Sequence, residues 1–284
     1  MKLHKPHADL FVPDQLPADK ALARTTHMGI GAHQDDLELM MYHPILACFQ
    51  EKEKWFTGVT ITDGRGSSRT GPYAHCTDEQ MREVRRKEQR NAAVLGDYAA
   101  MVQLDYSSKE AKDPANRPLV EDLKSLLLAA QPEVVHTHNP ADKHDTHVAV
   151  VVPVIQAIRE LPKEQRPKAV YGMEAWRSLD WVQDDEKVIF DISAREHLYG
   201  VLAGVWDSQI SGGKRYDLGC LGRKRANATM LASHSTDKAT MLEFGIDLTP
   251  LIKDDGLDLV EYTRELIRRF EIDVVSRLSK RLGR

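Results

Sequence analysis

The sequence predicts an α/β fold in which helices cover both faces of a mainly parallel sheet. Short apolar stretches typical of buried strands alternate with longer stretches of helical period along most of the chain, which is the pattern of parallel sheets. The first of these stretches, residues 27–32, is apolar enough for a strand buried on both faces. With 284 residues, 42% of them hydrophobic, the chain can form a large core.

The first half of the chain begins with residues 1–24, a segment with three prolines that we expect to be irregular. A strand over 27–32 then leads into a helix over 35–53, whose apolar positions Leu37, Met40, Met41 and Ile45 are close to helical spacing. A second strand over 55–64 ends at Asp63 and Gly64. The polar loop 64–80 is long enough to be functional, and the helix after it ends at Gly96.

The second half continues the alternation. We expect strands over 99–105, 133–139, 168–174 and 187–193, and helices over 118–131, 147–160, 193–209 and 257–282. The Gly-rich, basic segment 208–229 lacks the strand–loop–helix context of a phosphate loop, and we expect it to be a flap or a contact segment. The sequence thus predicts one domain over 1–284, with a core at about 25–235 and a C-terminal helical extension at about 236–284.

Composition argues against several classes of protein. The net charge of −4 provides no general basic field, so we expect no nucleic-acid partner. No stretch approaches 18 apolar residues, so we expect no membrane partner, and the polar N-terminus does not resemble a signal peptide. The three cysteines, Cys48, Cys76 and Cys220, are too widely spaced for a disulfide framework or a CxxC site. A cytoplasmic location is the expectation that follows.

Polar side chains gather where the predicted strands end. His33, Asp35 and Asp36 follow the first strand, Asp63 follows the second, and the segment 138–147 follows the fourth. Because ligands bind at the carboxyl ends of parallel strands, we expect these groups to lie at one edge of the sheet.

The segment 136–147 contains four histidines, and two of them, His144 and His147, are three residues apart, so they share one face of a helix. A hydrolytic zinc site needs two or three nitrogen or oxygen ligands and an open position for water. One histidine and one aspartate of the first cluster, with one histidine of the second, would provide it, and the other aspartate would accept the water's proton. The spacing leaves a structural alternative open, in which Asp35 or Asp36 caps the next helix and the histidines have packing roles.

Several motifs, in the same order, resemble those of the LmbE-like/PIG-L deacetylases: AHQDDLE at 32–38, TITDG at 60–64, RRKEQRNAAVLG at 85–96, and PEVVHTHNPADKHDTH at 132–147. The resemblance covers about residues 27–160, with a weaker similarity around His234. It implies a Rossmann-like α/β fold and zinc-dependent hydrolysis of N-acetyl groups, usually on N-acetylglucosamine; Fe²⁺ or Co²⁺ could replace zinc.

The resemblance also implies residue roles. His33, Asp36 and His147 would be the metal ligands, Asp35 the general base, and His144 the group that stabilises the tetrahedral intermediate. Two positions depart from the family's pattern. Gln34 replaces the usual proline, which should loosen the turn, and the HDTH order of 144–147 places its aspartate one residue earlier than the family's HxDH.

Candidate substrate contacts lie outside these motifs. Trp176 is expected to stack on a sugar ring, with Glu174 or Arg177 binding hydroxyl groups, although a core position is the usual fate of tryptophan. Asp63, Arg85 and His234 are weaker candidates for the same pocket, and Arg85 has an alternative partner in Glu88 on its own helix. The other histidines outside the two clusters, His4, His7, His27, His43, His75 and His197, are expected to have structural roles.

The function we expect is zinc-dependent removal of the N-acetyl group from an N-acetylglucosamine-type sugar or conjugate. Two alternatives remain open: hydrolysis of another amide, such as that of a sugar–thiol conjugate, and a Rossmann-like sugar-binding protein without catalysis. A dinucleotide site is disfavoured because GIGAHQ lacks the third glycine of the binding motif. The sequence leaves a homo-oligomer open.

Overall fold

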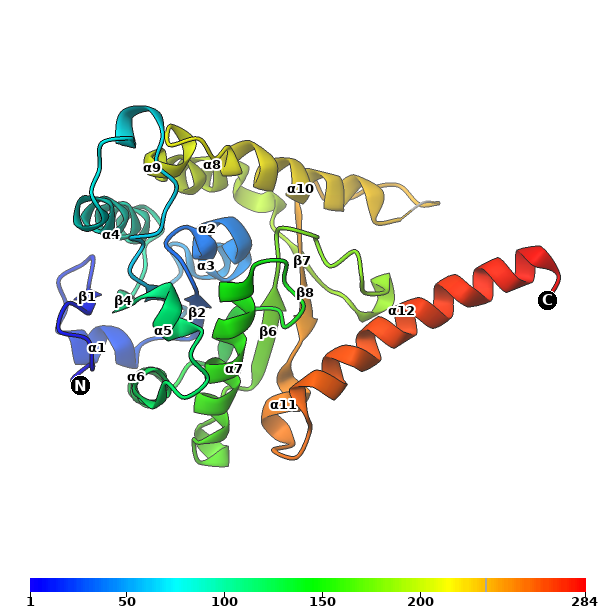
Figure 1. The fold of residues 1–284 in the computed structure, drawn as a ribbon, viewed down its shortest axis with the longest axis horizontal. Coiled ribbons are helices and arrows are strands. Elements are labelled where there is room, and N and C mark those ends of the chain that lie inside the picture. The colour runs from blue at the N-terminus through cyan, green and yellow to red at the C-terminus, as the bar shows by residue number, and fades with distance from the viewer. Residues whose placement is uncertain (233) are drawn as a thin grey trace.

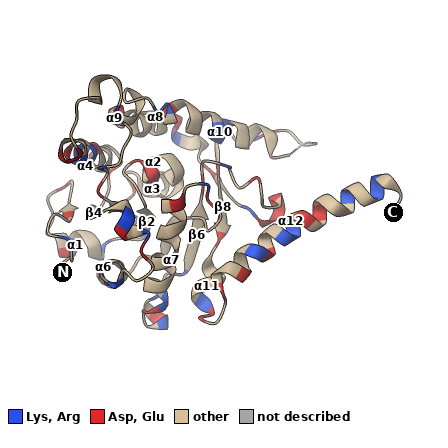
Figure 2. Cartoon of the chain, viewed as in Figure 1, with Lys and Arg blue, Asp and Glu red and all other residues tan. Residues whose placement is uncertain are grey.

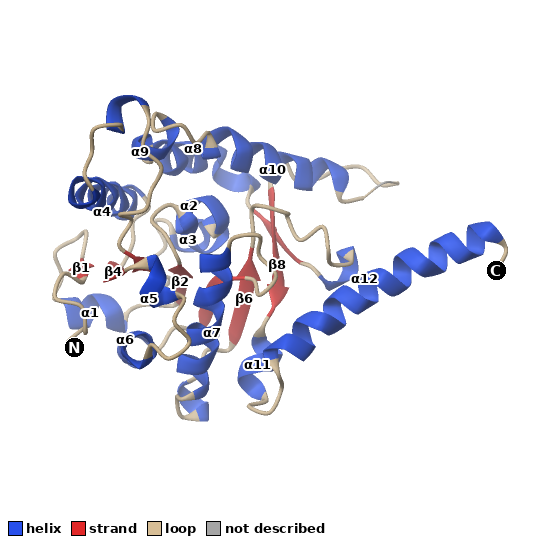
Figure 3. Ribbon diagram, viewed as in Figure 1, coloured by secondary structure: helices blue, strands red, loops and turns tan. Residues whose placement is uncertain are grey.

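The computed structural model describes residues 1–232 and 234–284. Within them, eight strands form one sheet in the order β1-β4-β3-β2-β5-β6-β8-β7 (Figures 1 and 3). Four neighbouring pairs, from β4 through β6, are parallel, whereas β1 and the pair β7–β8 join antiparallel. The predicted α/β fold with a mainly parallel sheet is therefore confirmed. The strands are β1 (Asp9–Phe11), β2 (His27–Gly31), β3 (Phe56–Thr62), β4 (Ala100–Tyr106), β5 (Val134–His138), β6 (Ala169–Met173), β7 (Val188–Asp191) and β8 (Leu242–Asp247).

Helices cover both faces of this sheet and form two apolar cores (Figure 1). One core packs α1 (Ala18–Ala23), α6 (Arg117–Ala130), α7 (Asp145–Arg159) and α11 (Thr249–Lys253) against one face. The other packs α2 (Asp36–Met40), α3 (Tyr42–Cys48), α4 (Asp78–Leu95) and α8 (Glu196–Gly204) against the opposite face. The remaining helices are α5 (Ser108–Ala111), α9 (Asp207–Ile210), α10 (Tyr216–Met230) and α12 (Leu259–Leu282), with short 3-10 turns that include η3 (Asp184–Glu186).

The chain reverses its direction of winding between β2 and β5. From β2 it proceeds through β3 to β4 on one side, and it later returns to place β5 and β6 on the other side. Loops that leave the carboxyl ends of two such strands diverge and form a crevice, which is the usual ligand position in open α/β sheets. The segments that follow β2 and β5 are those that carry the two predicted clusters.

The predicted helix over 35–53 is wrong in one respect, because it is broken into α2 and α3 at Met41. Pro44 lacks an N–H group, and its ring would clash with the carbonyl of residue 40 in a continuous helix. The break frees the N–H groups of Tyr42 and His43, and both donate to the carboxylate of Glu243, at 2.9 and 2.7 Å. A residue about two hundred positions away in the sequence therefore supports the break.

Three other expectations need correction. Residues 1–24 are not irregular throughout, since β1 pairs with the edge strand β4 and α1 buries Ala21 and Leu22. Segment 208–229 is largely the helix α10; its glycines at 219 and 222 have open space around them and do not interrupt it. The chain after about residue 236 is not only helical, because β8 lies between β6 and β7. These elements are short or contain glycines, so the hydrophobic periodicity of their sequences is too weak to predict them.

No helix in the described parts of the chain is both long enough and apolar enough to cross a membrane.

Candidate metal centre and active site

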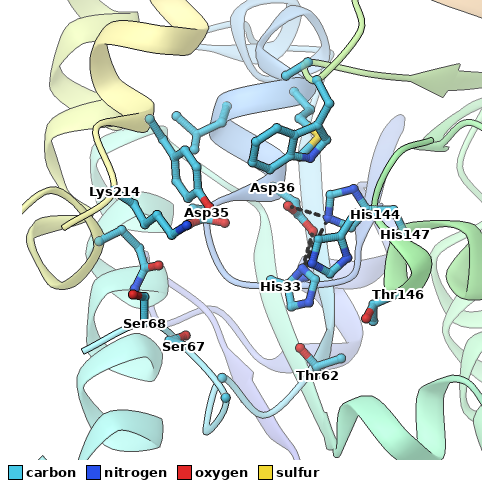
Figure 4. A pocket seen from close by; sticks show the side chains of 18 of the residues that line it. His33, Asp35, Asp36, Thr62, Ser67, Ser68, His144, Thr146, His147 and Lys214 are labelled. Atoms are coloured by element: carbon cyan, nitrogen blue, oxygen red, sulfur yellow. Dashed lines mark hydrogen bonds and ion pairs between the residues drawn. The ribbon is translucent and has the colours of Figure 1, made fainter. Parts of the chain in front are cut away.

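A cavity of about 810 Å³ opens at the carboxyl ends of β2 and β5 (Figure 4). All five residues that the family resemblance assigns to catalysis or metal binding line it, namely His33, Asp35, Asp36, His144 and His147. The first three lie on the turn between β2 and α2, and the two others lie at the start of α7. The alternation of strands and helices thus brings the two clusters together, although more than a hundred residues separate them.

Four donor atoms from three residues face one another in this cavity: one nitrogen each of His33 and His147, and both carboxylate oxygens of Asp36. His33 Nδ1 lies 3.3 Å from His147 Nε2 and 3.4 Å from Asp36 Oδ2, and His147 Nε2 lies 3.4 Å from Asp36 Oδ1. Ligands about 2.0–2.1 Å from a tetrahedral zinc ion are separated from each other by about 3.3–3.4 Å. The donor set and its spacing therefore fit a zinc-like ion with an open fourth position.

The electrostatics of the cluster favour a positive charge between these donors. Burial alone would raise the pKa of Asp36, but its contacts with His147 and His138 hold that pKa well below the usual range. Burial would lower the pKa of His147, yet the facing carboxylates of Asp36 and Asp142 raise it to about 10. In the metal-free chain a proton on His147 provides this positive charge. A divalent cation would displace that proton on binding.

Asp142 orients His147, and the sequence analysis did not identify it. Its Oδ2 lies 3.1 Å from His147 Nδ1, so that the Nε2 atom of the same ring faces the cavity. Its Oδ1 accepts a hydrogen bond of 2.7 Å from the backbone N–H of His144. A carboxylate on the far nitrogen of a metal-binding histidine fixes the ring and its tautomer. Asp145, in contrast, is exposed and lies 3.4 Å from Lys112, so it does not tune either histidine.

His138 is a second neighbour of the cluster. Its ring is fully buried, does not line the cavity, and places Nε2 3.2 Å from Asp36 Oδ2 and 2.9 Å from the backbone nitrogen of Ala32. Burial and the adjacent His147 lower the pKa of His138 to about 4, so the ring is neutral and its Nε2 accepts the backbone N–H of Ala32 beside the Asp36 carboxylate. The sequence feature that could have identified His138 is its position at the end of the strand that leads into the second cluster.

Asp35 occupies a backbone conformation that few residues adopt. Its φ of +91° lies in the left-handed region, and its side chain makes no capping hydrogen bond to α2. The carboxylate instead accepts a hydrogen bond of 2.9 Å from Arg85 Nη2, and the same nitrogen donates to the carbonyl of Gln34. Burial raises the pKa of Asp35, and Arg85 offsets part of that increase. The structure therefore contradicts the alternative in which the Asp35 side chain caps the helix that follows it.

Gln34 supports the turn instead of loosening it. Its side-chain amide donates to the carbonyl of Thr62 at 2.9 Å and lies 3.4 Å from Gln103 Oε1. Both partners belong to neighbouring strands, β3 and β4. The turn that a proline would stiffen is therefore tied to the sheet by hydrogen bonds.

The candidate substrate residues have different positions. Trp176 lines the cavity and packs edge-on against Tyr216, with ring centroids 5.4 Å apart. Arg85 also lines it, but the guanidinium is already bound to Asp35. The remaining four do not line the cavity within the described residues: Asp63 binds Arg65, Glu174 accepts from the backbone of Leu179, Arg177 points to Ala141, and His234 is exposed in the turn after α10.

The outer wall of the cavity is cationic. Lys112 at the end of α5, Lys214 before α10 and Arg223 on α10 all line it, and Figure 4 shows Lys214 extending toward Asp35. Among the described residues, the acidic ones on this wall are Asp35 and Asp36 at its base, and both are already paired. The lining therefore has more basic than acidic side chains, while Asp145 and Asp180, just outside it, contact Lys112 and Arg223.

Comparisons with known proteins identify structures of similar fold and one matching family. Among solved structures, a 4-carboxy-2-hydroxymuconate hydratase from Pseudomonas putida has a TM-score of 0.63 at 17% identity, covering 79% of this chain and 96% of its own. An N,N'-diacetylchitobiose deacetylase from Pyrococcus horikoshii has a TM-score of 0.63 at 17% identity, covering 81% and 86%. The zinc-inhibited form of a teicoplanin deacetylase has a TM-score of 0.56 at 13% identity, covering 78% and 98%.

These structures establish a shared fold. A comparison with curated protein sequences gave no match. The model of the PIG-L family, described as GlcNAc-PI de-N-acetylase, matches residues 28–173, which include both clusters and slightly more than half of the chain. This chain therefore belongs to the PIG-L family.

Proposed function

We propose that this protein is a metal-dependent N-deacetylase that removes the acetyl group from an N-acetylglucosamine-type sugar or sugar conjugate. The observation that carries the proposal is the convergence of donor atoms from His33, Asp36 and His147, with contacts of 3.3–3.4 Å between each pair of residues, in an open cavity that Asp35 also lines. Membership of a family described as a de-N-acetylase supports the reaction class.

His33, Asp36 and His147 would hold the ion, and zinc fits their donor types best. A divalent metal bound there supplies Lewis acidity, which lowers the pKa of water and polarises the amide carbonyl. Fe²⁺ and Co²⁺ suit the same two imidazoles and carboxylate.

Asp35 would act as the general base. Arg85 fixes one of its oxygens, Oδ2, so the other oxygen is the one available to accept a proton from the attacking water. His144 would stabilise the oxyanion by donating its ring N–H, and the proton that Asp35 accepts from water would pass to the leaving amine. The ring of His144 stacks on that of His147, with centroids 4.5 Å apart, and it stands exposed at the mouth of the cavity, where an acyl oxygen can reach it.

The wall around this centre favours a sugar joined to an anionic group. Trp176 and Tyr216 offer aromatic surfaces for a pyranose ring. Lys112, Lys214 and Arg223 are placed to bind a phosphate or carboxylate on the part of the substrate beyond the acetamide.

The first test measures metal content of the purified chain by elemental analysis and amine release from a panel of N-acetyl sugars on the same sample. We expect about one metal ion per chain, loss of activity on chelation, and recovery after addition of zinc, iron or cobalt. The metal is titrated from below one equivalent, because a relative by fold was solved in a zinc-inhibited form. Absence of metal, with no activity after any addition, would contradict the proposal.

Variants separate the base from the ligands. Asp35→Asn should retain the metal and lose turnover by about 10²–10⁴-fold, the usual contribution of a general base. His33→Ala should lose the metal as well. The matched control is Asp145→Asn, a nearby exposed carboxylate outside the cluster, which should keep both. Normal turnover by Asp35→Asn would show that another group accepts the proton.

Hydration of an unsaturated acid is a second candidate reaction. The hydratase from Pseudomonas putida has the same TM-score as the chitobiose deacetylase, and its substrate, as named, carries carboxylates that would suit the cationic wall. The two reactions differ in product: deacetylation releases an amine and acetate, whereas hydration of a conjugated double bond reduces ultraviolet absorbance. Both assays on one metal-loaded sample decide between them.

A further inference from the structure

The turn 174–179 follows β6 and borders the cavity through Ala175 and Trp176. Its backbone is unusual, because Ser178 and Leu179 have φ angles of +51° and +55° in succession and neither is glycine. Left-handed conformations of such residues are costly and persist where the surroundings impose them. The contacts of this turn therefore determine where Trp176 stands.

Glu174 closes the turn from its first position. The residue is 6% exposed, and its Oε2 accepts a hydrogen bond of 3.0 Å from the backbone N–H of Leu179 at the other end of the turn. The side chain of Leu179 is fully buried in the apolar core. The two ends are thus fixed to each other and to the core, and Ala175 and Trp176 lie between them, at the cavity.

One face of α10 supports the turn from the other side. The face carries a row of side chains that are four, three and four residues apart, a spacing that aligns them along the helix: Tyr216, Cys220, Arg223 and Asn227. The first three line the cavity. Asn227 Oδ1 accepts a hydrogen bond of 2.6 Å from the hydroxyl of Ser178, and Arg223 Nη2 lies 3.3 Å from the carbonyl oxygen of Trp176. The turn and this face of α10 therefore form one wall.

This wall is more aromatic than charged. Figure 2 shows that most of α10 is uncharged. Of its basic residues, Lys224 and Arg225 pair with glutamates of other elements, whereas Arg223 contacts the turn. The ring of Trp176 meets that of Tyr216 edge-on, at 86°, so the two form a corner in which a pyranose ring can lie against aromatic carbon.

We propose that Glu174 and Ser178 are positioning residues that set Trp176 for binding of the substrate's sugar ring. The inference rests on the proposed function, because the sugar is the substrate of that reaction. Both residues lie outside the lining of the cavity, as far as the structure describes it, so their effect on the substrate passes through Trp176.

The turn also touches the segment that supports the metal cluster. Arg177 Nη1 lies 3.3 Å from the carbonyl oxygen of Ala141, next to Asp142, which orients His147. A variant that disturbed the fold in general would therefore change metal content or kcat. A variant that only moves Trp176 should change KM.

The test compares steady-state kinetics on the methyl glycoside of N-acetylglucosamine, with the metal content of each chain measured on the same samples. Trp176→Ala should raise KM by about tenfold, which is the scale of one aromatic contact, with little change in kcat. Glu174→Ala and Ser178→Ala should raise KM in the same direction and by no more than that. Glu174→Gln keeps an oxygen that can accept from the N–H of Leu179, so its KM should stay near that of the unaltered chain.

A double substitution decides whether the effect passes through Trp176. Glu174→Ala should cause no further rise in KM in a chain that already carries Trp176→Ala. The control for lost stability is Leu22→Ala, at a buried leucine of α1, which packs on α6 and β4. It should lower the melting temperature and leave KM unchanged.

Calorimetric titration of the same glycoside into the metal-free chains separates this inference from the reaction. Binding that Glu174→Ala weakens, without turnover in any chain, would reject the deacetylase and retain the positioning role. Turnover with an unchanged KM in both Glu174→Ala and Ser178→Ala would overturn the inference and leave the deacetylase standing. A rise in KM of equal size with and without Trp176, or a glycoside that binds none of the chains, would overturn the inference as well.

Discussion

Arg85 contacts the groups that fix the geometry of Asp35. It donates to the Asp35 carboxylate at 2.9 Å and to the carbonyl of Gln34, and it lies within 3.3 Å of the Ser208 hydroxyl. Glu88 in turn accepts two hydrogen bonds from Ser208, at 2.7 and 2.6 Å. Arg85 thereby supports the left-handed turn and selects which carboxylate oxygen faces the substrate.

Replacement of Arg85 should separate positioning from folding. Arg85→Met leaves a buried carboxylate without its partner and should cost about 3–5 kcal/mol of unfolding free energy. Arg85→Lys keeps the charge but loses the planar fork that contacts Asp35 through Nη2 and Ser208 through Nη1, so we expect a kcat loss of about 10²-fold with little change in KM. Steady-state kinetics and urea unfolding check both, with Lys87→Met at an exposed neighbour as control. A normal kcat for Arg85→Lys would mean that Asp35 is positioned without it.

Asp142 should control metal affinity without being a ligand. Asp142→Asn keeps an acceptor for the backbone of His144 but removes the charge from His147 Nδ1, so we expect the metal dissociation constant to rise about 10–100-fold. Competition with a chromophoric chelator measures this constant. The control is Asp145→Asn, which should bind metal normally. Equal affinity in both variants would show that the ring of His147 is held by packing alone.

The sequence predicted that five candidate residues lie together, and they line one cavity because two rules apply to them. Residues after β2 and after β5 must share an edge of a parallel sheet, and their order matched the family's motifs. Asp142 and His138 were missed because their roles depend on which nitrogen or oxygen each side chain faces. Asp63 and Glu174 also follow strands, but neither lines the cavity. Asp63 accepts from Arg65, and Glu174 accepts from the backbone of Leu179, and strand position cannot predict such local partners.

At the scale of elements, the break between α2 and α3 depends on a buried ion pair. Glu243 on β8 accepts from the backbone of Tyr42 and His43 and contacts Lys224 of α10. It therefore joins the break near residue 41 to two elements that lie about two hundred residues later in the sequence. Lys224 and Glu243 are both buried, so solvent cannot take the place of either charge as a partner for the other.

Removal of one partner should cost more than removal of both. Glu243→Leu should destabilise the protein by about 3–5 kcal/mol, because it leaves Lys224 unpaired and two helix N–H groups unsatisfied. Adding Lys224→Met should recover part of that loss, and a double-mutant cycle in urea gives the coupling. Additive losses would show that the two side chains do not interact in the folded protein.

The elements that the sequence predicted well are those with strong periodicity. The core strands and helices α4, α6 and α12 lie within a few residues of the predicted bounds. The helix α10 was not predicted because its glycines and basic residues give it little apolar pattern, and it becomes ordered by packing on β8 and α8. Its placement matters for function, since it carries Arg223 and closes one wall of the cavity.

The whole molecule is acidic, whereas its cavity wall is basic. The net charge is −4, yet Lys112, Lys214 and Arg223 surround the entrance to the metal cluster. Such a local reversal of sign attracts an anion toward a concave site even though the overall charge would repel it. Lys112 and Arg223 have exposed acidic neighbours, at 3.4 and 3.6 Å, that an incoming anion can replace.

We therefore expect N-acetylglucosamine 1-phosphate to have a lower KM than its neutral methyl glycoside. Lys214→Met should raise KM for the phosphate by about fivefold, equivalent to ~1 kcal/mol, and leave the methyl glycoside unchanged. Added salt should reduce the difference between the two substrates, because screening weakens contacts at an open cavity. The control is Lys253→Met at the exposed end of α11. Turnover of both substrates with equal KM would retain the deacetylase and reject the anionic substrate, whereas turnover of neither after metal loading would count against the reaction itself.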